Sequence, residues 1–408
     1  MSKLMISLDY CGKNPTGKLQ ISGSKSESNR WLILQKLYKN IAIHNLSDAE
    51  DTRLLQKALK SDNELIDINH AGTAMRFLTS YFAVSEGKNV ILTGSERMKN
   101  RPIKILVDAL RSLDADISYL EKEGFPPLII SGKKILKNKV FIEGNVSSQY
   151  ISSLLLIAAS LQNGLTIEFT TEITSRPYLE MTITQLKELG ITLFWKDNSI
   201  TVEPFNPPYQ NKFEVEVESD WSSASYYYSL MSLSQNGEVW LSSFHQKSKQ
   251  GDAELSQLYE LLGVKTTFEN HQIYLKKIPD FVLPKSITLN LINSPDIAQT
   301  IAVTCFGLGI NCFLTGLHTL KIKETDRLQA LKNELEKLGA QVEITHNSLQ
   351  LISTKQLNKN ILIECYHDHR MAMAFAPLSV KIPIKIEDRT VVEKSYPNFW
   401  KDFQQLFI

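Results

Sequence analysis

The segment NCFLTGLHTLKIKETDRLQALKNELEKLGAQV, residues 311–342, contains the pattern on which the fold of this chain depends. A short apolar stretch typical of a strand precedes a polar loop, and leucines spaced for one helix face follow at positions 328, 331, 335 and 338. Gly339 ends this helix pattern, and a second strand pattern begins after it. Lys323 and Arg327 are expected in the first helical turn, where the helix dipole disfavours cations. Two cations at this position therefore suggest an anionic ligand.

The same order of strand, polar loop, helix and second strand occurs four times. The segments NVILTGSERMKNRPIKILVDALRSLDADI, GLTIEFTTEITSRPYLEMTITQLKELGITL and GEVWLSSFHQKSKQGDAELSQLYELLGVKT begin at Asn89, Gly164 and Gly237. With the copy at Asn311 the spacings are 75, 73 and 74 residues, and a weaker copy begins near Ile382. Periods this long lie outside the common solenoid repeats, so the repeated unit is a large βα module.

Helix patterns between the copies, at residues 147–161 and 295–306, indicate that each unit holds two helices and several strands. Such alternation predicts α/β layers. A (β/α)8 barrel is a weaker interpretation, because its units are about half as long. Six units, three in each domain, would divide the chain near Asp220.

Composition excludes several classes of partner. The 408 residues suffice for two domains, and 45 basic against 44 acidic residues leave a net charge of +1. No global field would recruit nucleic acid or an anionic membrane. The four cysteines, Cys11, Cys305, Cys312 and Cys365, lack CxxC spacing, which fits a reducing compartment. Without a signal-peptide core at the N-terminus, and with Gln, Gly and Asn interrupting the apolar run 297–317, we expect a soluble, cytoplasmic protein.

Two segments imitate known ligand motifs. Residues 12–18, GKNPTGK, nearly complete a P-loop, but Leu19 replaces the magnesium-binding hydroxyl and a strand pattern follows. His367 and His369 flank Asp368 without a partner cluster, so helix capping by Asp368 is a better interpretation than a metal site. We therefore expect neither an ATP-binding loop nor a metal centre.

Cations, hydroxyls and amides recur in the polar loops and at the helix starts, where backbone N–H groups are free to bind phosphate. Each segment alone also fits a capped helix with solvated charges. Asp296 is a structural acid favoured by the helix dipole, or a general base if its surroundings raise its pKa. The candidate ligand residues are Lys25, Ser26, Arg30, Gly72, Arg101, Ser147, Ser148, Gln149, Ser175, Tyr178, Asp296, Lys323, Arg327, Arg370 and Lys394.

Taken in order, the segments resemble those of the 5-enolpyruvylshikimate-3-phosphate synthase family, the 3-phosphoshikimate 1-carboxyvinyltransferases. The resemblance covers nearly the whole chain and rests on GSKSESNR, AGTAMR, RMKNRPI, SSQ, SRPYLEMT, ESDWSSASY, QGD, PDIAQTIA, KETDRL, DHRMAMAF and EKSYP. One such motif is a weak signal, whereas eleven in family order are specific.

The resemblance implies a two-domain inside-out α/β barrel. Each domain would hold three βαβαββ units about a pseudo-threefold axis, with helix N-termini directed to an interdomain cleft that holds the active site. Residues 20–219 would form one domain, and residues 1–19 with 220–408 the other.

The family's reaction transfers the enolpyruvyl group of phosphoenolpyruvate to the 5-hydroxyl of shikimate 3-phosphate and releases phosphate, without a metal or organic cofactor. The residues implied for shikimate 3-phosphate are Lys25, Ser26, Arg30, Ser147, Ser148, Gln149, Ser175, Tyr178, Asp296 and Lys323. The residues implied for phosphoenolpyruvate are Lys25, Gly72, Arg101, Gln149, Arg327, Arg370 and Lys394. The two small molecules would be the only partners of a monomer.

In the implied mechanism Asp296 accepts the hydroxyl proton, and Glu324 and Lys25 serve the proton transfers at C3 of phosphoenolpyruvate. His70 stands where many members have Asn, Phe77 where many have Pro or another residue, and Thr319 where some have Asn. The first two are expected beside the phosphoenolpyruvate pocket, where they bear on the response to the inhibitor glyphosate.

Three alternatives remain. A UDP-N-acetylglucosamine enolpyruvyl transferase would share the fold and chemistry but not the combination of KETDR and DHRMAMAF. A non-catalytic anion-binding homologue would bind ligand without turnover. Polynucleotide binding is disfavoured by the near-zero net charge.

Overall fold

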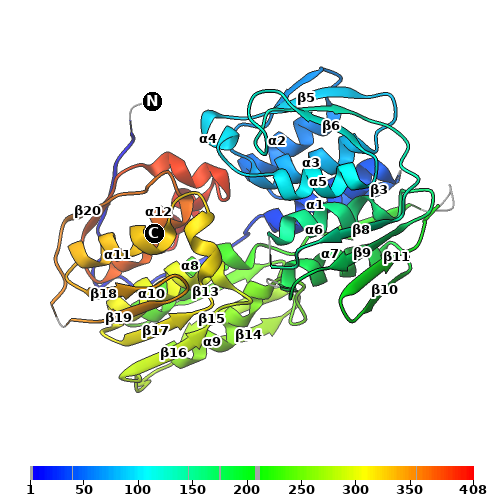
Figure 1. Cartoon of the computed structure of the whole chain (residues 1–408). Coiled ribbons are helices and arrows are strands. Elements are labelled where there is room, and N and C mark those ends of the chain that lie inside the picture. The colour runs from blue at the N-terminus through cyan, green and yellow to red at the C-terminus, as the bar shows by residue number, and fades with distance from the viewer. Residues whose placement is uncertain (1–2, 39, 146, 174–175, 207–211, 355) are drawn as a thin grey trace. The chain divides into compact units, whose positions relative to one another are not determined.

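The computed structural model describes residues 3–38, 40–145, 147–173, 176–206, 212–354 and 356–408 (Figure 1). The chain forms two compact units, one of Gly23–Val217 and one of Met1–Ser22 with Glu218–Ile408. The N-terminal residues join the second of these because β1 (Ile6–Leu8) pairs with β21 (Ile384–Ile386), and β2 (Thr16–Leu19) pairs with β13 (Glu238–Ser242). Each unit has its own hydrophobic core.

Four sheets share one topology. A strand from a predicted repeat start pairs in parallel with one neighbour and antiparallel with the other, and a further antiparallel strand completes the sheet. The Gly23–Val217 unit holds two of these sheets. The strands of the first are, in order, β4 (Leu65–Asp67), β5 (Asn89–Thr93), β7 (Leu128–Ser131) and β6 (Asp116–Tyr119). Those of the second are β8 (Lys139–Ile142), β9 (Leu165–Phe169), β11 (Ser199–Val202) and β10 (Leu193–Lys196). The other unit holds the remaining two. One has the order β2, β13, β15 (Gln272–Lys277) and β14 (Val264–Glu269). The other has the order β16 (Ser286–Asn290), β17 (Asn311–Thr315), β19 (Leu349–Ile352) and β18 (Gln341–Ile344).

Two smaller sheets are shorter versions of the same arrangement. β21 pairs in parallel with β20 (Ile361–Ile363) and antiparallel with β1. β3 (Ile41–His44) pairs in parallel with β12 (Phe213–Glu216). The predicted repeat is therefore confirmed, since β5, β9, β13 and β17 begin within one residue of the four predicted starts and β21 lies at the weaker copy. Separate sheets of at most four described strands exclude a (β/α)8 barrel.

The helices follow the sequence pattern with small shifts. The predicted helix 147–161 is α6 (Ser148–Ala158), and 295–306 divides into a 3-10 turn, η3 (Pro295–Ile297), and α10 (Ala298–Leu308). The other helices of the first unit are α1 (Lys25–Leu37), α2 (Glu50–Lys60), α3 (Gly72–Ala83), α4 (Glu96–Lys99), α5 (Lys104–Ser112) and α7 (Arg176–Glu188). Those of the second are α8 (Trp221–Leu233), η1 (Gly251–Glu254), α9 (Leu255–Leu258), η2 (Tyr259–Leu262), η4 (His318–Ile322), α11 (Arg327–Lys337), α12 (His369–Phe375), η5 (Ala376–Val380), η6 (Arg389–Lys394) and α13 (Phe399–Gln405).

Buried hydroxyls join equivalent helices of successive repeats. Ser80 bonds Ser153 between α3 and α6. Between α8 and α10, Oγ of Ser225 lies 3.1 Å from Oγ1 of Thr300. One turn further along both helices, Oγ1 of Thr304 donates to Oγ of Ser229 at 2.8 Å. These partners are 73 to 75 residues apart, which is the repeat period. Small polar side chains let these helices approach closely while their own hydrogen bonds stay satisfied.

α10 packs on β17 and β19 (Figure 1). Within the described residues, no helix combines the length and apolar character needed to cross a membrane.

Candidate active site

Two helix N-termini lie side by side in the unit Gly23–Val217. Gln149, the second residue of α6, donates from Nε2 to Oγ1 of Thr73, the second residue of α3, at 3.1 Å. One turn on, Ser153 Oγ donates to the Arg76 carbonyl at 2.8 Å. The two helices therefore run parallel, and their positive ends meet at one place. Free N–H groups at paired helix starts are suited to an anion.

Two guanidinium groups reach the start of α3. Arg76 donates from Nη1 to the Gly72 carbonyl at 2.8 Å. A Cβ atom on Gly72 would lie 2.5 Å from Nη1 of Arg101 and 2.9 Å from Nη1 of Arg76. A side chain at this position would force both guanidinium groups to move away. The predicted Gly72 and Arg101 are thus together, and Arg76 joins them.

Arg30 is a buried cation with neutral partners. Its guanidinium donates to Thr182 Oγ1 at 2.7 Å, to Ser152 Oγ at 3.1 Å, and to the carbonyls of Ser26 and Tyr178. Among the described residues each of its hydrogen-bond partners is neutral. Burial lowers the pKa of Arg30 to about 10, so the group stays charged at neutral pH. The charge of the buried Glu27 favours the charged form of Arg30, and an anionic ligand nearby would add to this stabilisation.

Lys25 lies at the first position of α1, after the Ser24 cap. Its ammonium lies 3.3 Å from Oδ2 of Asp51, which is buried in the first turn of α2. The lysine side chain keeps 21% of its surface exposed while the carboxylate keeps 5%. Asp51 therefore orients Lys25 and leaves its other donors available.

The remaining predicted residues of this unit lie at the same helix starts. Ser147 caps α6, Ser148 and Gln149 begin it, and Tyr178 is in the first turn of α7. Ser175 lies outside the described residues. Arg101 lies in the connection between α4, which ends at Lys99, and α5, which begins at Lys104. His70 is exposed, and its Nδ1 lies 2.6 Å from Oγ of Ser95. Phe77 is buried, and the centre of its ring lies 5.4 Å from the guanidinium group of Arg30.

In the other unit, three equivalent residues of successive repeats meet. Arg370 donates from Nη1 to the Asp296 carbonyl at 3.1 Å, and its Nη2 lies 3.3 Å from Asp296 Oδ2. The same Nη2 donates to Ser222 Oγ at 3.1 Å. Arg370 is 74 residues from Asp296 and 148 from Ser222, one and two repeat periods. Asp296 and Ser222 lie at the starts of η3 and α8, and Arg370 is the second residue of α12.

Arg327 is enclosed by three carboxylates. Its Nε lies 2.7 Å from Asp368 Oδ2, Nη1 lies 2.9 Å from Asp296 Oδ1, and Nη2 lies 2.8 Å from Glu324 Oε2. The arginine side chain is 2% exposed and that of Asp368 is 0% exposed. Burial opposes the charge, but Asp368, Glu324 and Asp296 raise the pKa of Arg327 above its ordinary value. The cation predicted at this helix start is thus balanced by acids of the protein.

Two lysines reach the same carboxylates from outside. Lys394 Nζ lies 2.8 Å from Glu324 Oε1, and Lys323 Nζ lies 3.4 Å from Asp296 Oδ1. The prediction that Lys323 lies in the first turn of the helix is wrong. It follows η4, and α11 begins at Arg327 because Asp326 caps it by accepting from the N–H groups of Leu328 and Gln329.

The predicted base is held strongly ionised. Burial would raise the pKa of Asp296, but Arg370, Lys323 and Arg327 together hold it well below its ordinary value. The sequence interpretation required a raised pKa for general-base work, and the surroundings of Asp296 in this structure do the opposite. Anions that neutralise these cations would raise the pKa of Asp296 again.

Several neighbours of the site escaped sequence reasoning. Asp368 was predicted only as a cap, a role that is confirmed because it accepts from the Arg370 N–H, yet it also holds Arg327. Ser222 could have been found by counting one repeat period back from Asp296. No local pattern singles out Asp51, whose partner Lys25 lies on another helix. Arg76 and Asp252 stand in the AGTAMR and QGD motifs but were assigned no role.

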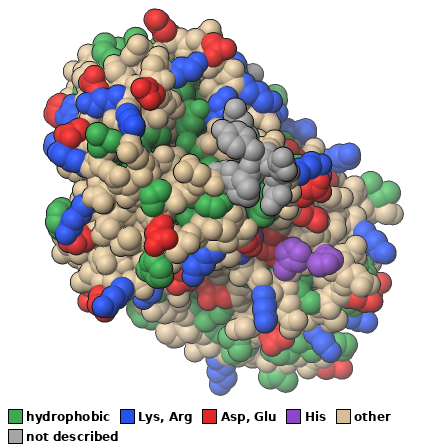
Figure 2. All heavy atoms as spheres, turned by 90° about the vertical axis from the view of Figure 1, so that its right-hand side faces the viewer, with side chains coloured by type: hydrophobic (Ala, Val, Ile, Leu, Met, Phe, Trp, Pro, Cys, Tyr) green, Lys and Arg blue, Asp and Glu red, His purple; other side chains and the backbone are tan. Residues whose placement is uncertain are grey.

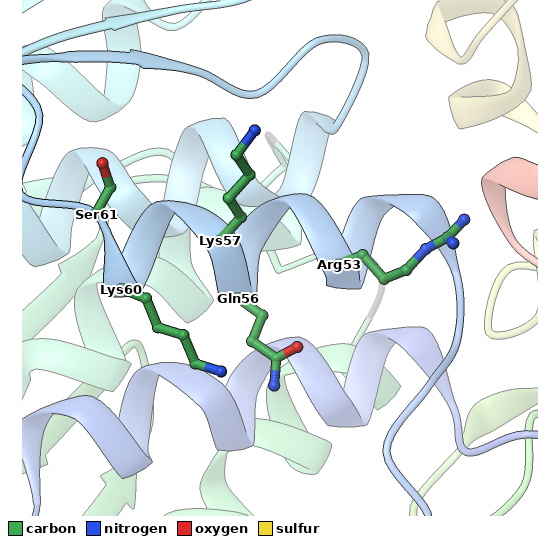
Figure 3. A pocket seen from close by; sticks show the side chains of 5 residues that line it. All are labelled: Arg53, Gln56, Lys57, Lys60 and Ser61. Atoms are coloured by element: carbon green, nitrogen blue, oxygen red, sulfur yellow. The ribbon is translucent and has the colours of Figure 1, made fainter.

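One surface depression is lined by none of the candidate site residues named above. It has a volume of about 500 Å³ and is lined by Arg53, Gln56, Lys57, Lys60 and Ser61, on α2 and just after it. Figure 3 shows Lys57 pointing away from Gln56 and Lys60, so these side chains do not converge on one ligand. Within the described parts of the chain, no three His, Cys, Asp or Glu side chains are grouped as metal ligands.

Charge on the visible surface is mixed. Figure 2 shows Lys and Arg side chains interspersed with Asp and Glu over the face that it depicts, in keeping with the net charge of +1. Nucleic-acid binding typically uses a patch of one sign, whereas the described side chains on that face carry both signs.

The repeated βα units, with cations beside the starts of α3, α11 and α12, have the fold of the enolpyruvyl transferases. The EPSP synthase from Acinetobacter baumannii matches with a TM-score of 0.80 at 20% identity, over 99% of this chain and 98% of that one. The enolpyruvyl transferase NikO from Streptomyces tendae matches with a TM-score of 0.74 at 11% identity, over the same shares. These likenesses confirm the predicted α/β fold class.

The chain belongs to the EPSP synthase (3-phosphoshikimate 1-carboxyvinyltransferase) family, whose model matches residues 56–403. A 3-phosphoshikimate 1-carboxyvinyltransferase of Bacteroides fragilis (strain YCH46) is 44% identical, over 95% of this chain and 94% of the relative. One from Haemophilus influenzae (strain ATCC 51907 / DSM 11121 / KW20 / Rd) is 35% identical, over 96% of each. The family resemblance predicted from the eleven motifs is confirmed.

Proposed function

We propose that this protein transfers the enolpyruvyl group from phosphoenolpyruvate to the 5-hydroxyl of shikimate 3-phosphate and releases inorganic phosphate, a step of aromatic amino acid biosynthesis. The observation that carries the proposal is the match to relatives of that name along nearly the whole chain, at 44% identity. The names of the relatives favour shikimate 3-phosphate over a UDP-sugar as acceptor.

The two substrates would draw on both compact units, which we take as the two domains of the family fold. Shikimate 3-phosphate would meet Lys25, Ser26, Arg30, Ser147, Ser148, Gln149, Ser175, Tyr178, Asp296 and Lys323. Phosphoenolpyruvate would meet Lys25, Gly72, Arg101, Gln149, Arg327, Arg370 and Lys394. The burial of Arg30 and the convergence of Arg101 and Arg76 on Gly72 support these assignments.

In the first half of the reaction, the 5-hydroxyl oxygen bonds to C2 of phosphoenolpyruvate while its proton passes to Asp296 and C3 gains a proton. The tetrahedral intermediate then loses phosphate from C2 and a proton from C3, which restores the C2–C3 double bond. Glu324 and Lys25 are the partners at C3 that the family resemblance implies, and in the structure they pair with Lys394 and Asp51. Binding of two anions beside Arg370 and Lys323 would raise the pKa of Asp296 enough for it to accept a proton.

The test is phosphate release by the purified full chain. Phosphate should appear only when both substrates are present, with a product whose mass is that of the enolpyruvyl ether, and turnover should persist after treatment with a chelator. A faster rate with UDP-N-acetylglucosamine as acceptor would favour the related transferase. Binding of both substrates without turnover would mean a non-catalytic homologue.

Lys25→Ala should lower kcat by about 10²–10³-fold, since a fixed cation beside the departing phosphate is lost. Phosphate release measures this loss. Lys36→Ala is the matched control, because Lys36 is exposed in the last turn of the same helix. Equal rates in the two variants would remove Lys25 from the mechanism.

Gly72→Ala should raise the KM for phosphoenolpyruvate about tenfold or more and change kcat less. The new methyl group would displace the guanidinium groups of Arg101 and Arg76. Gly87→Ala is the control. Gly87 has a φ of +78° and open space around the position of an added Cβ atom, so this substitution should cost only about 1–2 kcal/mol of backbone strain. An unchanged KM in the Gly72 variant would contradict the assignment.

We further propose a cytoplasmic monomer. Analytical ultracentrifugation of the purified chain tests the oligomeric state, and a dimer at assay concentration would refute that part.

A further inference from the structure

Asp252 is a buried carboxyl beside the proposed site that the mechanism above does not use. It lies in η1, and its Oδ2 accepts a hydrogen bond from Ser222 Oγ. Ser222 Oγ in turn accepts from Arg370 Nη2 at 3.1 Å, and that nitrogen also lies 3.3 Å from Asp296 Oδ2. One guanidinium group therefore serves two carboxyls, Asp296 directly and Asp252 through a hydroxyl.

The groups that face Asp252 come from three other elements. Asp296 lies at η3, Arg370 on α12, and Ser222 and the cap Asp220 at α8. Burial above all, and then the charge of Asp296, raise the pKa of Asp252 to about 7, although Arg370 and the Ser222 bond oppose the shift. Asp252 thus changes its charge near neutral pH, whereas Asp296 stays ionised.

A purely structural role explains this carboxyl poorly. An asparagine could accept the same bond from Ser222, and its neutral amide would cost less to bury than a carboxylate. The two acids share one nearby cation at Arg370, so their charges are coupled. Any anion that binds Arg370 removes part of the positive charge that keeps Asp252 ionised.

We propose that Asp252 is a positioning residue that sets the charge available on Arg370 and takes up a proton when phosphoenolpyruvate binds there. The inference rests on the proposed function, in which Arg370 contacts phosphoenolpyruvate. An incoming anion neutralises Arg370 and adds negative charge, and both effects favour the protonated form of Asp252.

The direction of the pH effect follows from linkage. Below about pH 7, Asp252 already holds its proton and phosphoenolpyruvate binds without penalty. Above it, binding must first restore the proton, so the KM for phosphoenolpyruvate should rise by up to about tenfold per pH unit. Because Asp252 acts through Ser222 and Arg370, kcat should change less than KM.

The experiment compares the full-length wild type with Asp252→Asn. Steady-state kinetics at saturating shikimate 3-phosphate give the KM for phosphoenolpyruvate from pH 6 to 8.5. Calorimetric titration with phosphoenolpyruvate alone, in two buffers of different ionisation enthalpy, counts the protons taken up at pH 7.5. The ligand's own titration is common to both proteins, so their difference reports Asp252.

Wild type should take up more protons than Asp252→Asn, and only the variant should have a flattened KM profile above pH 7. Glu254→Gln is the matched control, since Glu254 is a half-buried carboxyl in the same η1 turn that bonds Ser294 instead. If Asp252→Asn does not fold, Ser222→Ala tests the same link and should weaken the pH dependence.

Equal proton uptake and equal pH slopes in wild type and Asp252→Asn would overturn the inference, as would an equal effect of Glu254→Gln. These outcomes leave the proposed function standing, because the wild type would still turn over. A wild type that neither binds nor consumes phosphoenolpyruvate would instead refute the proposed function.

Discussion

Asp296→Asn is expected to lower kcat about 10³-fold while shikimate 3-phosphate still binds. Asparagine keeps the size of the side chain and an oxygen for Arg327 Nη1, which lies 2.9 Å from the present carboxylate. It cannot accept the hydroxyl proton, and removing a general base costs about 10²–10⁴-fold in rate. The loss of a negative charge leaves Arg370 and Lys323 less neutralised, so anionic substrates should bind as well or better.

Phosphate release gives kcat, and calorimetric titration with shikimate 3-phosphate gives the affinity. Asp280→Asn is the control, because Asp280 is exposed and its φ of 50° is one that asparagine tolerates. A rate for Asp296→Asn within threefold of wild type would show that another group accepts the proton.

Arg327→Ala is expected to lower the free energy of unfolding by about 3–5 kcal/mol, because it leaves the buried carboxylate of Asp368 without its cation. Asp368 is 0% exposed and bonds Arg327 Nε at 2.7 Å, and the same arginine holds Asp296 and Glu324. Repulsion among the three acids should also disturb the proposed site, so turnover should fall as well.

Chemical denaturation followed by circular dichroism measures the change in stability. Arg389→Ala serves as the control, since Arg389 is exposed in η6 and its removal should stay within about 0.5 kcal/mol. A denaturation midpoint for Arg327→Ala equal to that of this control would contradict the role of the buried arginine.

Much of the fold was accessible from the sequence because it depends on local pattern. Apolar periodicity located the strands that begin at Asn89 and Asn311, and cap residues such as Ser147 and Asp368 marked helix starts. The repeat period also carries tertiary information. Ser222, Asp296 and Arg370 meet because equivalent positions of stacked repeats lie side by side.

Sequence reasoning placed one cation less well. Lys323 was assigned to the first helical turn, but it lies in the connection before α11. A cap three residues later, Asp326, begins that helix. Boundaries of this kind depend on which of several capping residues the surrounding packing selects.

By itself, the sequence determined the period, the α/β class and the family, because helix and strand patterns and motif order are properties of neighbouring residues. Only the tertiary structure decided which charges compensate one another. Arg327 forms ion pairs with three acids of the protein, while Arg30 donates hydrogen bonds to neutral hydroxyls and backbone carbonyls. Asp296 and Asp252 have pKa values shifted in opposite directions although burial raises the pKa of both. Burial and the distance to an opposite charge set these values, and both arise from residues far apart along the chain.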